Sequence, residues 1–452
     1  MAKVAGGEAK ISVTSRVLSL AWPAIVEQTL AMTVGIADTA MVGRIGAYAL
    51  ASVGLGAQVM MVAITVFAAI STGTTALVAR CIGAGEKEEA CRVARQSLVL
   101  GVSIAVATSA ALLIWAPQVV HLLFRRSEPH VLANACIYVR IVGAALIPNF
   151  LMIIMNSILR GSGDTKTPMR VMAIVNVINV SLNYLLIFGH GPWPAMGVKG
   201  AALATALAQL TGGLLLTRIM FSGRKIIHLH WRDNYRPHMQ TIKRVLRVGV
   251  PAGIEQAVMR IGQVSYTIIV SSLGTVAYAA HQIALNAESL SFMPGFGFAL
   301  AATTLVGQAL GAGDTEEAGR SGWQAAKLAA LIMGAIGVLF FLFPSKFVSI
   351  FTPDKDVIAN SAQVLRIVAI AQPFLALNMV LAGGLRGAGD TRTIMFITGI
   401  GVCGVRLVLA YTLVSLGYGL VGAWVAMVVD LIMRSCFLLW RFHHGGWKHI
   451  RV

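Results

Sequence analysis

Residues 159–168 read LRGSGDTKTP, and residues 385–394 read LRGAGDTRTI, so the chain contains nearly the same decapeptide twice. Two further pairs of segments repeat at almost the same distance. VARCIGAGEKEEA in the first half matches VGQALGAGDTEEA in the second half, and WPAIVEQ matches VPAGIEQ. The offset is 385 − 159 = 226 for the decapeptides, and 306 − 78 = 228 and 250 − 22 = 228 for the other pairs. A repeat with a nearly constant offset indicates a duplicated structural unit that fills about half of the chain.

The composition places this duplicated unit in a membrane. Hydrophobic residues make up 57% of the 452 residues, whereas Asp, Glu, Lys and Arg together make up 12%. Soluble domains contain about 25% charged residues, so a soluble chain of this composition could not cover its own surface. Apolar stretches long enough to cross a hydrocarbon core of ~30 Å as helices recur along the chain. We place them near residues 17–42, 50–78, 95–117, 131–157, 168–189, 197–220, 246–272, 277–308, 324–344, 360–383, 393–416 and 419–440. The sequence therefore predicts an all-α integral membrane protein with twelve transmembrane helices in two pseudo-symmetric six-helix lobes.

The distribution of positive charge predicts the topology. Lys and Arg outnumber Asp and Glu by 36 to 18, which gives a formal net charge of +18. With the N-terminus placed inside, 26 of the 36 basic residues fall on inner segments, six on outer segments and four within the spans. This pattern follows the positive-inside rule and argues against a nucleic-acid partner. We expect a multi-pass monomer in the lipid bilayer of the plasma (inner) membrane, with both termini cytoplasmic.

One substantial polar break divides the chain between the sixth and seventh spans. We expect an N-terminal six-helix lobe at residues 1–222, a cytoplasmic basic linker at 223–245 and a C-terminal six-helix lobe at 246–452. Because each half holds an even number of spans, both halves enter the membrane in the same orientation. The pseudo-twofold axis should then run along the membrane normal, as in transporters built from parallel repeats around a shared cavity.

The histidines and cysteines do not indicate a metal or a cofactor. Three linker histidines lie among Arg and Trp residues, where we expect them at the lipid headgroup interface; they are His228, His230 and His238. The five cysteines are scattered without CxxC spacing. We therefore expect no metal site, no disulfide framework and no cofactor.

Several motifs resemble those of one transporter family. In the first span, LAWPAIVEQTLAMTVGIADTAMVGRIG, Pro23 is followed fifteen positions later by Asp38 and then by MVGRIG. The LRGxGDTxTP turn, the Asn-rich NVINVSLNY and SFMPGFGFALAATTLVGQALGAG also match. Over essentially its whole length the chain resembles the multidrug and toxic compound extrusion (MATE) family, within the multidrug, oligosaccharidyl-lipid and polysaccharide exporter superfamily. The resemblance implies two six-helix lobes around a V-shaped cavity. It also implies export of organic cations or amphiphilic drugs by alternating access, coupled to inward movement of H⁺ or Na⁺.

Asp38 is the first candidate for the coupling site. An ionisable group in hydrocarbon costs about 2.5–3.5 kcal/mol on insertion scales, so each one needs a function or a partner. Asp38 lies in the outward half of the first span, and Arg44 lies beyond the end of that span. We interpret Asp38 as the carboxylate that binds H⁺ or Na⁺. The alternative is a helix-end carboxylate that Arg44 or backbone amides satisfy.

Three amides of the fifth span extend this candidate site. Asn176, Asn179 and Asn183 stand at positions i, i+3 and i+7, which places them on one helical face. In several MATE proteins the position that matches Asn183 is a second aspartate facing the first, and here it is an amide. We expect this face to meet Asp38, where the amides can bind Na⁺ or hydrogen-bond a protonated carboxyl group. The alternative is an amide stripe that only binds neighbouring helices.

Pro23, Glu27 and Glu255 add candidates near the start of each lobe. Pro23 removes a backbone hydrogen bond and can bend the first helix, a motion that accompanies the transport switch in MATE proteins; the alternative is an ordinary helix-start proline. Glu27 and Glu255 are repeat partners, four residues after matched prolines. We interpret Glu27 either as a relay toward the inside or as a carboxylate paired with Arg near the inner interface. Glu255 is a candidate for a second-lobe cation site, as the resemblance implies.

The second lobe holds a further group of charged residues within its spans: Glu288, Arg260, Arg406, Asp430 and Arg434. Their charges nearly balance, and Asp430 and Arg434 have the i, i+4 spacing of a helical ion pair. We interpret the group as an ion network that holds helices together, with a proton route as the alternative.

Other functional classes fit the sequence less well. A flippase of lipid-linked precursors, from the same superfamily, needs a cavity rich in Arg and Lys and is the alternative function. A membrane-embedded enzyme needs a catalytic motif such as HExxH or GxSxG, and the chain has neither. We therefore expect a transporter and not an enzyme.

Overall fold

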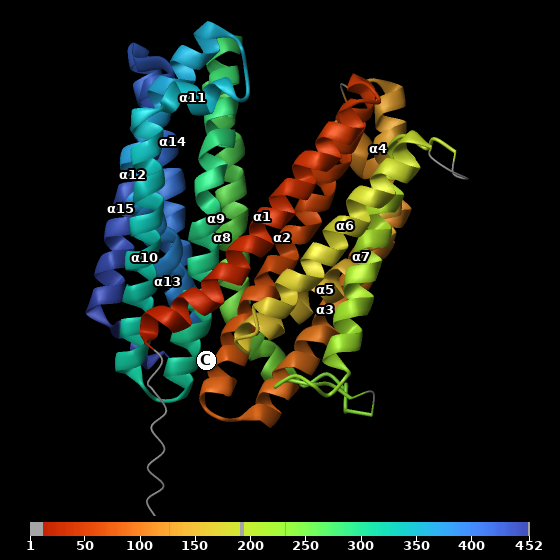
Figure 1. Cartoon of the computed structure of the whole chain (residues 1–452), viewed down its shortest axis with the longest axis vertical. Coiled ribbons are helices and arrows are strands. Elements are labelled where there is room, and N and C mark those ends of the chain that lie inside the picture. Colours follow the sequence, from red (N-terminus) through yellow and green to blue (C-terminus); the bar gives the residue numbers. More distant parts are fainter. Residues whose placement is uncertain (1–11, 126, 190–193, 231, 451–452) are drawn as a thin grey trace, which may run out of the picture.

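The computed structural model describes residues 12–125, 127–189, 194–230 and 232–450, and all regular structure in these ranges is helical (Figure 1). The first half contains α1 (Val13–Gly43), α2 (Ala47–Gly83), α3 (Lys87–Leu123), α4 (Pro129–Ala144), α5 (Leu146–Gly161), α6 (Lys166–Phe188) and α7 (Val198–Met220). The second half contains α8 (Met239–Ser271), α9 (Thr275–Gly311), α10 (Thr315–Leu342), α11 (Pro344–Ser349), α12 (Lys355–Ala388), α13 (Thr391–Gly399), α14 (Leu407–Leu413) and α15 (Gly419–His444). A π-helical turn, Ile400–Arg406, joins α13 to α14, and a second, Val414–Tyr418, follows α14.

The helices supply the expected twelve membrane spans. Nine helices in the described ranges are long and apolar enough to cross a membrane, and ten if α4 and α5, bent by 52°, form one span. One of these nine helices is the continuous segment 391–444. Gly417 interrupts it with a φ of 90°, and α15 packs back against α14. This segment therefore contains two spans. The remaining span is α8, whose charged residues lower its hydropathy.

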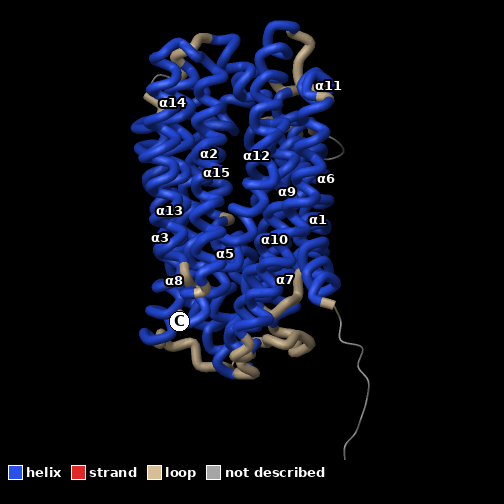
Figure 2. The backbone as a smooth tube through the Cα atoms, turned by 90° about the vertical axis from the view of Figure 1, so that its left-hand side faces the viewer, coloured by secondary structure: helices blue, strands red, loops and turns tan. Residues whose placement is uncertain are grey.

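The helices form two bundles that run along the long axis of the molecule. Figure 1 shows the bundles side by side near the loop that joins α7 to α8, and apart at the end that carries α4 and α11. The view in Figure 2 shows loops gathered at the two ends of the helices. We call the end with the α7–α8 loop the linker end. The lobe boundaries expected at residues 222 and 245 stay predictions, and the predictions for the two termini fall partly on residues 1–11 and 451–452, outside the described residues.

The first helix of each lobe begins in the core of the other lobe. Near the start of α1, Arg16 forms an ion pair of 2.9 Å with Glu317 of α10, and Val17 and Ala21 belong to a core cluster of the second bundle. Val245, near the start of α8, belongs to the core of the first bundle. Each lobe is therefore anchored to the other by its own first helix.

The repeated GAG segments pack against each other across the pseudo-twofold axis. A Cβ atom at Gly83, at the end of α2, would collide with the backbone of Gln308 in α9. A Cβ atom at Gly311, at the end of α9, would collide with the backbone of Arg80 in α2. Glycine at these two positions therefore lets α2 and α9 approach closely at the linker end.

The repeated LRGxGDT motifs hold equivalent ion pairs in both lobes. Arg160 pairs with Glu27 at 2.5 Å, which joins α5 to α1, and Arg386 pairs with Glu255 at 2.6 Å, which joins α12 to α8. Both glutamates are buried, whereas the two arginine side chains are about one-fifth exposed. These pairs explain why the WPAIVEQ and LRGxGDT motifs recur together.

The aspartates of the same motifs bind basic residues that follow or end the sixth span of each lobe. Lys225 donates to Oδ2 of Asp164 at 2.6 Å, and Thr167 donates to the same carboxylate through its backbone N–H and its hydroxyl. Burial raises the pKa of Asp164, but these hydrogen bonds outweigh burial and hold the pKa below its usual range. In the second lobe, Arg441 pairs with Asp390 at 2.8 Å. The duplicated loops are therefore structural anchors.

Candidate functional site

Asp38 of α1 lies against α6 and makes no ion pair among the described residues. Its Oδ1 accepts a hydrogen bond of 2.5 Å from Nδ2 of Asn183. The side chain of Asp38 is half-buried, and Arg44 does not pair with it. An ionised carboxylate without a counter-charge in a membrane helix is costly. This position therefore favours a bound proton or cation.

Two of the three predicted amides belong to the Asp38 site. Asn183 Nδ2 also donates to Oδ1 of Asn179 at 3.0 Å, while Oδ1 of Asn183 is buried without a hydrogen-bond partner in the described part of the chain. That oxygen is available to a cation or to a donor that the protein itself does not supply. Asn176 instead donates to the backbone carbonyl of Leu30 at 2.8 Å. This hydrogen bond joins α6 to α1 closer to the linker end.

Tyr138 of α4 is a member of this site that sequence reasoning missed. The side chain is buried and interacts electrostatically with Asp38. A single tyrosine in an apolar span gives no signal by itself. Comparison of the repeats would have found it, because the matching position in the second lobe, at the offset of 226, is Val364. The polar residue is present in one lobe only.

Pro23 and Glu27 lie on α1 between the linker end and Asp38. Pro23 is buried inside α1, ten residues after the first residue of the helix, so it is not a helix-start proline; a bending role stays a prediction. Glu27 precedes Asp38 by eleven residues, about 16 Å along a helix with a rise of ~1.5 Å per residue. Because Glu27 pairs with Arg160, it matches the ion-pair interpretation, and the relay stays a prediction.

The second lobe contains an open cavity of about 500 Å³, and charged residues line part of its wall. Four arginines and two glutamates contribute to the wall: Arg260, Arg386, Arg406, Arg434, Glu255 and Glu288. The predicted residues of the second lobe are thus brought together, with Asp430 directly behind the wall. Glu255 forms an ion pair with Arg386.

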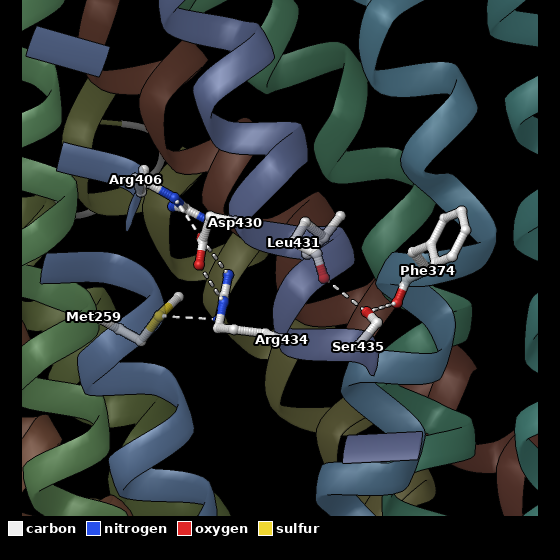
Figure 3. A network of polar contacts seen from close by, with 7 residues as sticks. All are labelled: Met259, Phe374, Arg406, Asp430, Leu431, Arg434 and Ser435. Carbon is white, nitrogen blue, oxygen red and sulfur yellow. Dashed lines mark hydrogen bonds and ion pairs between the residues drawn. The ribbon is translucent and has the colours of Figure 1, made fainter. Parts of the chain in front are cut away.

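Asp430 is the centre of this group, and two arginines share it (Figure 3). Its side chain is completely buried and pairs with Arg406 at 2.8 Å and with Arg434 at 2.9 Å. The predicted i, i+4 pair of Asp430 and Arg434 is therefore present. Glu288 of α9 is buried, interacts electrostatically with Arg406 and makes no side-chain hydrogen bond in the described ranges.

The two groups of polar residues suit different ligands. The Asp38 site offers a carboxylate and an unpaired amide oxygen, which suit a proton or a single monovalent cation. The second-lobe group offers mainly guanidinium N–H donors. Within the described residues, no cluster of three or more His, Cys, Asp or Glu side chains could hold a metal ion.

Twelve spans in two parallel repeats, with an isolated carboxylate in a membrane helix, define a multi-pass membrane transporter. The sequence profile of the MatE family matches residues 23–185 and again 251–412. The two matched ranges start at 23 and 251, and 251 − 23 = 228 reproduces the offset of the internal repeat. The chain therefore belongs to the MATE family, as the sequence motifs predict.

Relatives of known sequence and structure agree with this assignment. The chain is 37% identical over 440 residues to the probable multidrug resistance protein NorM of Thermotoga maritima, covering 96% of this chain and 93% of that protein. It is 27% identical to the uncharacterized transporter YisQ of Bacillus subtilis, with 96% and 95% covered. Two solved MATE structures, described as the bent and the straight conformation, are each 26% identical. They superpose with TM-scores of 0.88 and 0.89; 96% of this chain is covered in both cases, and 96% and 97% of the solved chains.

Proposed function

We propose that this chain is an exporter of organic cations or amphiphilic drugs, which works by alternating access in exchange for H⁺ or Na⁺ bound at Asp38. Membership of the MATE family and the multidrug resistance names of relatives such as NorM support multidrug efflux. The plasma membrane, cytoplasmic termini and a monomeric state are part of the same proposal.

The single observation that carries the coupling proposal is the environment of Asp38. Its carboxylate has a hydrogen bond from Asn183 and no ion pair among the described residues. A proton or Na⁺ would neutralise the charge that the protein leaves unbalanced. The unpaired Oδ1 of Asn183 would add a second oxygen ligand for Na⁺. Asp38, Asn179 and Asn183 would therefore form the coupling site, with Asn176 holding α6 in place.

Cargo and coupling cation would compete through charge. A cationic substrate is attracted to ionised Asp38, and a cation bound at Asp38 removes that attraction. By thermodynamic linkage each ligand weakens binding of the other, so cation entry from outside favours release of cargo there. Because α1 packs on both bundles and holds Pro23 between Arg16 and Asp38, a change of its shape would reach both lobes.

Transport in proteoliposomes tests this proposal. Efflux of ethidium, a fluorescent organic cation, is measured with a proton gradient alone and then with a sodium gradient alone. We expect one gradient to drive efflux in the wild type and Asp38→Asn to abolish it. Glu316→Gln removes an exposed carboxylate at the start of α10 and is the matched control, expected to transport normally. Normal efflux by Asp38→Asn would overturn the proposal.

The alternative function, a flippase of lipid-linked precursors, is favoured by one observation: four arginines line the second-lobe cavity. A flippase would move a fluorescent phospholipid with a pyrophosphate-like head across the same liposomes without an ion gradient. Drug efflux without such lipid movement would exclude it.

A further inference from the structure

The proposed function does not use the second-lobe cavity, although the cavity has an unusual charge balance. Arg386 is balanced by Glu255, and Asp430 can balance only one of the two arginines that share it. Glu288, which interacts with Arg406, balances the other. Arg260 then remains without an acidic partner among the described residues. With all groups ionised, the cavity and Asp430 carry one net positive charge.

Several guanidinium donors in this group also lack an acceptor. Within the described residues, the single hydrogen-bond partner of Arg434 Nη1 is the sulfur of Met259, at 3.8 Å, and sulfur is a weak acceptor (Figure 3). Nη1 of Arg406 has no hydrogen bond in the described part of the chain, although Nε and Nη2 bind Asp430. Arg260 has none within the same ranges either. Arg406 and Arg434 are buried as residues and line the cavity, and Arg260 is exposed on its wall. Their remaining N–H donors are therefore available to an acceptor that enters the cavity.

An anion is the ligand that satisfies both deficits. Guanidinium groups bind carboxylate and phosphate through parallel N–H donors, and they retain their charge at any physiological pH. Arg406 and Arg434 are already oriented by Asp430, so a ligand would not have to order them. Arg260 is exposed and belongs to the cavity wall, where it can approach the same ligand.

The rest of the cavity wall is mainly apolar. It includes three methionines and two phenylalanines: Met259, Met379, Met427, Phe292 and Phe296. Methionine side chains are flexible and polarizable, so they adapt to ligands of different shape. A volume of about 500 Å³ is in the range of cavities that bind small organic molecules. The ligand should therefore carry an apolar body behind its charged end.

We propose that the second-lobe cavity binds an anionic amphiphile, with its carboxylate, sulfonate or phosphate held by Arg260, Arg406 and Arg434. Its apolar part lies against the methionines and phenylalanines of the wall. The ligand can be a soluble organic anion or an anionic phospholipid, which share this chemistry. Asp38 is not among the residues that line this cavity. Equilibrium binding requires no ion gradient, so the site can be tested separately from the coupling reaction.

Binding to the purified full chain in phosphatidylcholine nanodiscs tests this site. The probes are a dansyl-labelled alkyl carboxylate and the corresponding uncharged amide. We expect the carboxylate to bind at least tenfold more tightly than the amide. Arg260→Gln should reduce that ratio about fivefold to tenfold, whereas Glu288→Gln, which removes an opposing carboxylate, should increase it.

The control is Arg366→Gln, because Arg366 is an exposed arginine of α12 outside the cavity wall. It should leave the ratio unchanged, and so should Asp38→Asn, which separates this site from the coupling site. Equal binding of carboxylate and amide, or equal effects of Arg260→Gln and Arg366→Gln, would overturn the proposal. Adding phosphatidylglycerol to the nanodiscs then identifies the source. If phosphatidylglycerol weakens apparent binding of the carboxylate in the wild type but not in Arg260→Gln, the site binds a phospholipid. If binding to the wild type is unchanged, the site binds a soluble anion.

Discussion

The two lobes share a scaffold but have opposite polar chemistry in the middle of their spans. Counted with the offset of 228, Asp38 corresponds to Tyr266, which is buried and lies 5.5 Å from the ring of His281. Counted with 227, the offset between the ends of the two matched ranges, Asn179 corresponds to Arg406. An acid and an amide in the first lobe are therefore replaced by an aromatic residue and a guanidinium in the second.

At the linker end, by contrast, the polar side chains of the two lobes match. Glu27 and Arg160 in the first lobe have the same partners and geometry as Glu255 and Arg386 in the second. Interactions present in both lobes hold helices together, since both lobes need the same scaffold. Polar groups present in one lobe are candidates for ligand binding. Substitutions that affect either the scaffold or ligand binding, but not both, test this distinction.

The largest expected effect is on the stability of the second lobe. Asp430→Asn would leave Arg406 and Arg434 buried without a carboxylate, and we expect the free energy of unfolding to fall by about 3–5 kcal/mol. Asp38→Asn, which breaks no ion pair among the described residues, should change it by about 1 kcal/mol or less. Thermal unfolding in nanodiscs measures both. Equal losses would show that Asp38 also serves the scaffold.

Loss of either repeated ion pair should lower the free energy of unfolding by a similar amount in the two lobes, and by less than Asp430→Asn does. Glu27→Gln and Glu255→Gln each leave a partly exposed arginine without its partner, and we expect each to lower the free energy of unfolding by about 1–3 kcal/mol. Glu316→Gln, at an exposed pair with Arg320, should have almost no effect. Efflux assays separate the roles further. If Glu27→Gln stops transport at unchanged stability, Glu27 is a relay and not a structural anchor.

The course of the chain through the membrane could be predicted from the sequence, because hydrocarbon imposes both helix length and apolar composition. The fifth span illustrates this: the stretch placed near 168–189 is α6, Lys166–Phe188. The Asp430–Arg434 pair was predictable for a similar reason, since i, i+4 neighbours meet on any helix. Local rules were sufficient in both cases.

Contacts between distant helices could not be predicted in the same way. The sequence offered an arginine as one possible partner of Glu27, but it did not identify Arg160 of α5 as that arginine. The packing of Val17 in the second bundle also depends on the assembled lobes. Likewise, the three amides share a helical face, yet only Asn179 and Asn183 join Asp38, because the crossing of α1 and α6 brings Asn176 to a backbone carbonyl.

The anchor at Asp164 predicts a dependence of stability on pH. Its lowered pKa means that the ionised carboxylate stabilises the fold above the pKa of the unfolded chain, about 3.9. That contribution is lost as the pH falls through the folded-state value. We expect Asp164→Asn to lower the free energy of unfolding by about 1–2 kcal/mol at pH 7, and the difference from wild type to shrink below about pH 4. Thermal unfolding across pH 3–8 measures this, with Asp390→Asn as the repeat-matched variant; a constant difference at all pH values would contradict it.

The smallest expected effect distinguishes the two coupling ions. Asn183→Ala removes both the hydrogen bond to Asp38 and the amide oxygen that has no partner among the described residues. Asn176→Ala removes an amide that donates to the Leu30 carbonyl. A hydrogen bond donated to the ionised carboxylate opposes protonation, so Asn183→Ala would lower the H⁺ concentration for half-maximal efflux about fivefold if H⁺ is the coupling ion. If Na⁺ is the coupling ion, the variant loses an oxygen ligand, and the Na⁺ concentration for half-maximal efflux would rise about fivefold instead. Asn176→Ala should change neither concentration. Identical behaviour of the two variants would remove the amides from the coupling site and leave Asp38 as its only member.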